Sequence, residues 1–311
     1  MKIKNMSYVL LLILLVTVSC NSVKSVANSK VPTAKRVMVL GLDGISVAGY
    51  KTAKHPNLDE LFGKGMISFN TRTVMPSVTL PNWTSHLTSG GPEQHGVDGN
   101  DWTLEKNNIP PVEQDENGYY PSIFKVLKEQ MPVVKTAYYY NWASLINPIN
   151  KRYLDEVRFL ENDEYHQNYK SAVQFAETYK NDPSLIFLYS VHTDHAGHKH
   201  KWMSQEYIKA IEEADEAIGK LIEDMKAKGI FEDTHFILLT DHGGKGHGHG
   251  GVSETEMIVP WAIVGTQIKN AASFQSPNSN TNTAAVIARL FGIDDLPESW
   301  VGKIPSGIFK N

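Results

Sequence analysis

Residues 235–251 join a continuous apolar segment to a loop of aspartate, histidine and glycine. The segment Phe236–Leu239 has the composition of a strand that is buried on both faces of a parallel sheet. The loop begins with Asp241 and His242 and contains six glycines and two further histidines. Ligands bind at the carboxyl ends of such strands, aspartate and histidine are zinc ligands, and glycines let the backbone fold tightly around them. The stretch therefore predicts an α/β sheet with a metal site at one edge.

Two other apolar segments also lead to an aspartate. The segment 37–42 precedes Asp43, and the segment 185–191 precedes Asp194, which is followed four residues later by His198. Residues four apart face the same side of a helical turn, so Asp194 and His198 can act together. Three buried and unpaired carboxylates would be very costly, and cations remove that cost. The sequence thus predicts a multi-metal centre.

Predicted strands and helices alternate along the chain, which favours a largely parallel central sheet with helices on both faces. The predicted strands are 36–42, 67–75, 136–142, 185–191, 236–239 and 258–264. The predicted helices are 56–62, 81–89, 121–130, 163–179, 204–228 and 281–291.

The N-terminus has the pattern of an export signal. A charged start and a short apolar segment, 8–18, predict a signal peptide over residues 1–19. Cys20 is the only cysteine, and its position resembles a bacterial lipobox, although Thr17 stands where an aliphatic residue is favoured. We therefore expect an exported protein of the periplasm or cell surface, held to the membrane by a lipid on Cys20. An ordinary secretory signal with an incidental cysteine is the alternative.

The mature chain is expected to form one catalytic domain. Residues 20–35 are polar and predict a flexible tether, and no second linker interrupts residues 36–311. A small lid is expected within 92–180. The formal net charge of −4 gives no indication of nucleic-acid binding, and the oligomeric state is not predicted.

A hydroxyl group lies at a predicted helix start. Pro76 and Pro81 bracket a turn that contains Thr79, and Pro81 suits the first turn of a helix. A helix N-terminus stabilises anions, both an alkoxide of Thr79 and a bound phosphate. Ser77 is a rival nucleophile in the same turn.

Five separated motifs resemble the alkaline phosphatase superfamily and, within it, the type I phosphodiesterase/nucleotide pyrophosphatase branch. They are Asp43, Thr79-Leu-Pro-Asn82, Asp194 with His198, Asp241-His242 and His249-Gly-Gly. The resemblance runs in order from about Arg36 to Gly265, which is most of the mature chain.

The resemblance implies two Zn²⁺ ions, although other divalent metals could replace them. It implies one ion on Asp43, Asp241, His242 and the Thr79 oxygen, and the other on Asp194, His198 and His249. It further implies that Thr79 attacks phosphorus to form a phospho-threonine, which water then hydrolyses, and that Asn82 donates a hydrogen bond to a phosphate oxygen. His247 competes with His249 for the ligand position.

The expected substrate is a small phosphate ester. Two zinc ions and three carboxylates leave one positive charge, which a diester or pyrophosphate monoanion balances better than a monoester dianion. A phosphomonoesterase or phosphotransferase on the same site remains the alternative. The motif lacks the arginine of the sulfatase pattern. A different class, a non-catalytic zinc-binding lipoprotein, would require neither Thr79 nor Asn82.

Overall fold

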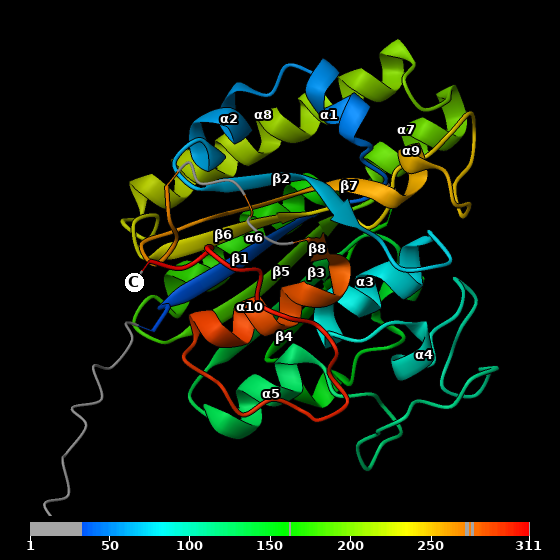
Figure 1. The fold of residues 1–311 in the computed structure, drawn as a ribbon. Helices are drawn as coiled ribbons and strands as arrows, with labels where there is room; N and C mark the ends of the chain where they lie inside the picture. Colours follow the sequence, from blue (N-terminus) through cyan, green and yellow to red (C-terminus); the bar gives the residue numbers. More distant parts are fainter. Residues whose placement is uncertain (1–32, 162, 271–273, 275–276, 311) are drawn as a thin grey trace, which may run out of the picture. The chain divides into compact units, whose positions relative to one another are not determined.

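The computed structural model describes residues 33–161, 163–270, 274 and 277–310. An eight-stranded sheet, in the order β4-β3-β5-β1-β6-β7-β2-β8, forms its centre (Figure 1). The strands are β1 (Arg36–Leu42), β2 (Met66–Arg72), β3 (Lys135–Tyr140), β4 (Glu156–Phe159), β5 (Ser184–Ser190), β6 (Thr234–Leu239), β7 (Ile258–Val264) and β8 (Asn278–Ser279).

Every neighbouring pair from β4 to β6 is parallel. Strand β7 alone runs against its neighbours, since it is antiparallel to both β6 and β2, and β2 is parallel to β8. The predicted largely parallel sheet is therefore confirmed.

Helices cover both faces of the sheet, as predicted (Figure 1). One face packs against α1 (Val47–Thr52), α2 (Pro56–Phe62), α6 (Tyr165–Thr178) and α8 (Gln205–Ala227). The other face packs against α3 (Thr79–Thr88), α5 (Ile123–Gln130) and α10 (Thr283–Leu290). The short helices are α4 (Pro92–His95), α7 (His192–His200) and α9 (Glu254–Met257), with 3₁₀ turns η1 (Ala143–Ile146), η2 (Lys151–Tyr153) and η3 (Asn280–Asn282).

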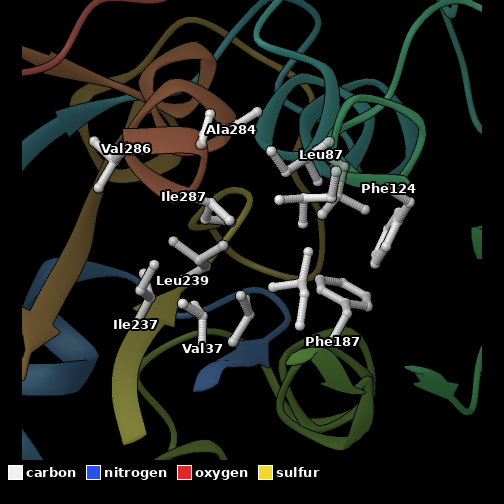
Figure 2. Close-up of a cluster of buried hydrophobic side chains, with 14 of the residues drawn as sticks. Val37, Leu87, Phe124, Phe187, Ile237, Leu239, Ala284, Val286 and Ile287 are labelled. Atoms are coloured by element: carbon white, nitrogen blue, oxygen red, sulfur yellow. The ribbon is translucent and has the colours of Figure 1, made fainter. Parts of the chain in front are cut away.

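Alternating side chains of the central strands enter the two cores. Figure 2 shows Val37, Phe187 and Leu239 of three adjacent strands meeting Leu87 of α3 and Ile287 of α10. Because these strands are buried on both faces, their sequences are mainly apolar and do not alternate between polar and apolar residues.

The register of the central strands places three chain segments side by side at one sheet edge. Leu42 pairs with Ser190, and Gly41 pairs with Leu239, so β1, β5 and β6 end at the same level. The segments that follow these three ends carry the aspartates of the predicted site, with Asp194 in the first turn of α7.

Most predicted elements are found with small shifts at their ends. The predicted helix 81–89 begins two residues earlier, at Thr79, because a proline in the third position is still within the first turn and needs no amide partner. Helix α7 was predicted only as a helical turn between Asp194 and His198. Strand β4 was not predicted, because it is short and its side chains are largely exposed.

The signal peptide, Cys20 and most of the tether lie outside the described residues. Within the described ranges, no helix has the length and apolar character needed to cross a membrane. The lid within 92–180 stays a prediction.

Candidate active site

Thr79 is the first residue of α3, and its hydroxyl lies at the centre of the sheet edge. Val78 before it has an extended backbone, so the helix begins abruptly. The side chain is buried, and its Oγ1 lies 3.2 Å from Nε2 of His242. The unpaired amides of the first helical turn make this a favourable position for negative charge. Thr79 is thus placed as the sequence predicted.

Three histidines present the same ring nitrogen to this centre. The Nδ1 atoms of His198, His242 and His249 each lie within hydrogen-bonding distance of a backbone carbonyl. These acceptors belong to His247, Gly243 and Ser77, at 2.8, 2.9 and 3.1 Å respectively. A carbonyl can only accept, so Nδ1 carries the proton and Nε2 keeps a free lone pair. This arrangement is typical of histidines that bind metals.

Three aspartates each direct one oxygen without a donor into the same centre. Within the described residues, Asp43 Oδ1, Asp194 Oδ1 and Asp241 Oδ2 are buried and have no hydrogen-bond partner. The second oxygen of Asp43 accepts from the Tyr189 hydroxyl, and that of Asp241 accepts from the amide of Gly44 at 3.1 Å. Asp43 and Asp241 are therefore oriented by a donor on one oxygen, while their other oxygen has no donor.

The free oxygens and the free nitrogens face one another. His242 Nε2 lies 3.1 Å from Asp241 Oδ2 and 3.5 Å from Asp43 Oδ1. His249 Nε2 lies 3.6 Å from Asp194 Oδ1 and 3.1 Å from the corresponding nitrogen of His198. Lone pairs at these distances repel unless a cation lies between them.

The pKa values show how unfavourable this cluster is by itself. Burial, followed by the neighbouring carboxylates, raises the pKa of Asp43 and Asp241 well above the usual value, and burial raises that of Asp194 to about 7. Burial also lowers the pKa of His249 to about 4 and that of His242 well below its usual value. Buried carboxylate oxygens without a donor that face neutral imidazoles fit divalent cations, and these oxygen and nitrogen atoms suit zinc.

The ligand atoms form two groups within reach of a cation. Asp194, His198 and His249 make one group, and Asp43, Asp194 and His242 make the other. Asp194 belongs to both, which the sequence did not predict. The first group opens to solvent through the exposed side chain of His198, whereas Asp43 and His242 are fully buried. Asp241 belongs to neither group but lies 3.1 Å from Nε2 of His242. The Thr79 oxygen and the six other predicted ligands thus lie together, and their role in holding metal stays a prediction.

The predicted role of Asn82 does not fit its surroundings. Its side chain is fully buried, and Nδ2 lies 2.9–3.4 Å from the carbonyls of Val74, Pro76 and Val78. Its Oδ1 accepts from the amide of Val74 and from Nδ2 of Asn280. The amide group is therefore fully used in fixing the turn before Thr79 and has no donor for a phosphate.

Asn100 has the free donor that Asn82 lacks, and sequence reasoning missed it. Its Oδ1 accepts at 2.8 Å from the amide of Leu80, the residue directly after Thr79. Within the described part of the chain, its Nδ2 makes no hydrogen bond, and the residue is half-buried. The available signal was weak, because Asn100 lies in a turn-rich segment with no periodic relation to Thr79.

The rival residues are engaged elsewhere. Ser77 Oγ donates to the carbonyl of Gly251 at 2.7 Å, which joins the turn before Thr79 to the glycine-rich loop. His247 is exposed, and its Nδ1 donates to the carbonyl of His198 at 2.8 Å. This geometry favours Thr79 over Ser77 and His249 over His247.

Known proteins match this chain over the same region. The family model described as type I phosphodiesterase / nucleotide pyrophosphatase matches residues 37–252. The ectonucleotide pyrophosphatase/phosphodiesterase family member 3 of Rattus norvegicus is 28% identical over 215 residues, covering 67% of this chain and 24% of the relative. The bis(5'-adenosyl)-triphosphatase ENPP4 of Homo sapiens is 24% identical over 248 residues, covering 75% of this chain and 52% of the relative. The chain thus spans about a quarter to a half of the length of these relatives.

Solved structures of the same kind share the fold. Murine ectonucleotide pyrophosphatase / phosphodiesterase 5 has a TM-score of 0.70 at 15% identity, with 84% of this chain and 96% of that chain covered. The human protein of the same name has a TM-score of 0.71 at 14% identity, with 86% and 97% covered. These matches confirm the fold class and the family resemblance predicted from the five motifs.

Proposed function

The chain belongs to the type I phosphodiesterase / nucleotide pyrophosphatase family, and from this premise we propose that it is a two-metal phosphoesterase. The reaction is hydrolysis of a phosphodiester or pyrophosphate bond through a phospho-threonine on Thr79. The observation that carries the proposal is the meeting of three unsatisfied carboxylate oxygens with three free imidazole nitrogens beside one hydroxyl.

Six side chains would hold the metal ions. They are Asp43, Asp194, His198, Asp241, His242 and His249. Zinc ions bound there would supply positive charge that lowers the pKa of a hydroxyl and of a water, and that neutralises charge developing on the oxygens around phosphorus.

The chain's own groups then act on the substrate. Thr79 Oγ1 attacks phosphorus from the N-terminus of α3, where the helix field favours its alkoxide. The bond from Oγ1 to phosphorus forms as the bond to the leaving oxygen breaks, and water later replaces the threonine oxygen. Asn100 Nδ2 donates to a non-bridging phosphate oxygen, a role that its fixed Oδ1 orients.

The charges around the site favour a diester or pyrophosphate. Within the described residues, no lysine or arginine forms an ion pair with Asp43, Asp194 or Asp241, whose partners are histidines. Two zinc ions and three carboxylates leave one positive charge, which balances a singly charged phosphodiester. The name of the human relative, a bis(5'-adenosyl)-triphosphatase, gives further support for a pyrophosphate substrate.

The test compares three chromogenic substrates on metal-quantified protein. Bis-p-nitrophenyl phosphate should turn over faster than p-nitrophenyl phosphate, and p-nitrophenyl sulfate should not react. Faster monoester turnover would overturn the diester preference. Tight zinc binding without hydrolysis of any substrate would instead support a non-catalytic zinc-binding lipoprotein.

Export and a lipid anchor on Cys20 are part of the proposal, and they are supported by the sequence pattern of residues 1–20. Mass spectrometry of the mature N-terminus after expression in a bacterium should find a lipid-modified cysteine. Release of Cys20→Ser into the soluble fraction is the expected consequence, and an unmodified N-terminus beginning elsewhere would contradict the anchor.

A further inference from the structure

The turn after α7 has an unusual backbone for its residue types. Lys201 has a φ of 81° and a ψ of 143°, and Met203 has a φ of 70°. Positive φ strains residues with a Cβ, and the conformation of Lys201 is close to one that is essentially confined to glycine. These two strained residues flank Trp202, so the contacts of Trp202 must hold the turn in place.

The indole of Trp202 fills a narrow slot between helix α7 and the glycine-rich loop of the candidate site. A Cβ on Gly197 would lie 2.7 Å from the indole, and a Cβ on Gly244 would lie 2.2 Å from it. Only glycine therefore fits at these two positions while Trp202 occupies the slot. Its Nε1 donates to the carbonyl of Gly44 at 2.8 Å, and its backbone amide donates to Gly246 at 2.9 Å.

Trp202 also contacts both histidines of the more exposed ligand group. Its ring lies edge-on to His198, with centroids 5.2 Å apart and an interplanar angle of 85°. It lies against His249 at 5.9 Å and 66°. The residue therefore touches the loop after Asp43, helix α7 and the glycine-rich loop, which are the three segments that bring the ligands together.

We infer that Trp202 is a positioning residue that sets the orientation of His198 and His249 toward a shared metal ion. The Nδ1 hydrogen bonds fix which nitrogen each ring presents, and the indole limits rotation and displacement of both rings. The strained turn keeps the indole in its slot. This inference rests on the proposed metal site.

The test measures zinc binding rather than catalysis. Competition of the full chain with a chromophoric chelator should show two zinc equivalents, and Trp202→Ala should weaken one of them by about 10–100-fold, as is typical when support of a metal ligand is lost. The absorption spectrum of the cobalt-substituted protein should also change in Trp202→Ala. Trp202→Phe, which keeps a ring but loses the bond to Gly44, should weaken the same site by a smaller factor of about three- to tenfold.

Trp300 provides a matched control. It is also a buried indole whose Nε1 donates to a backbone carbonyl, that of Pro121 at 3.0 Å, but it lies outside the candidate site. Trp300→Ala should leave both zinc affinities and the cobalt spectrum unchanged even if it lowers the melting temperature.

The outcomes distinguish a failure of the inference about Trp202 from a failure of the proposed function. A wild-type protein that binds no zinc would overturn the proposed function. Wild-type affinity and spectrum in Trp202→Ala would overturn only the role of Trp202. If Trp202→Ala does not fold, Trp202→Phe provides the test. A loss of zinc affinity of about three- to tenfold at one site supports the inference, and an unchanged zinc affinity refutes it.

Discussion

Replacing Asn100 by aspartate separates the two functions of its side chain amide. Aspartate keeps an oxygen that can accept from the amide of Leu80, so the start of α3 remains capped. It loses the Nδ2 donor and places a negative charge where a phosphate oxygen would lie. Loss of one such donor in an acyl-transfer enzyme lowers kcat by about 10²–10³-fold, which corresponds to about 2.7–4 kcal/mol of transition-state stabilisation. We therefore expect at least this loss in Asn100→Asp.

The assay is steady-state hydrolysis of bis-p-nitrophenyl phosphate, with the melting temperature measured by circular dichroism. The melting temperature should change little, because the cap is kept. Asn107→Asp, which makes the same substitution at an exposed position of the same segment, should leave kcat unchanged. Activity of Asn100→Asp within about threefold of the wild type would refute the assigned role, since a single direct donor contributes far more.

Three further predictions concern the nucleophile and the stability of the fold. Thr79→Ala should abolish turnover while both zinc equivalents still bind, and residual turnover in metal-loaded protein would exclude Thr79 as the nucleophile. Asp215→Ala should lower the free energy of unfolding by about 2–4 kcal/mol in urea titrations, because the buried carboxylate accepts from the amides of Asn57 and Leu58 at the start of α2. Burial lowers the pKa of His86 and His95 from 6.5 to about 3, so the unfolded chain takes up protons that the folded chain does not. The free energy of unfolding should therefore fall as the pH drops from 6.5 towards 3, and His95→Gln should make this pH dependence shallower. An unchanged pH dependence in the variant would contradict the lowered pKa of His95.

The sheet and its active edge could be predicted because burial on both faces leaves a clear pattern. The strands before Asp43, Asp194 and Asp241 are buried at every position and mainly apolar in sequence, as expected of strands that are covered on both faces. The register of β1, β5 and β6 then follows from parallel pairing, and with it the meeting of the three carboxylates. Strand β4 was not predicted, because an exposed edge strand needs no such apolar pattern.

The donor residue could not be predicted, because a side chain's direction depends on contacts that sequence distance does not encode. Asn82 lies three residues from Thr79, yet three carbonyls of the preceding turn surround its amide. Asn100 lies much further along the chain, and only folding of the segment after α4 brings its oxygen to Leu80. The contacts of Trp202 could not be predicted for the same reason, since its indole packs between a glycine of α7 and a glycine of the glycine-rich loop.

Asp194 belongs to both ligand groups, and this sharing affects how the protein would respond to the supply of metal. Because Asp194 belongs to both ligand groups, filling one group would reduce the negative charge that is left for the other. Linkage would make this effect reciprocal, so in the proposed two-metal site the second ion would bind more weakly than it would alone. Under the proposed two-metal mechanism, turnover would require both ions and would therefore follow the weaker affinity. When zinc is scarce, a large share of folded protein would hold a single ion and remain inactive, and a small rise in free zinc would restore activity without new synthesis.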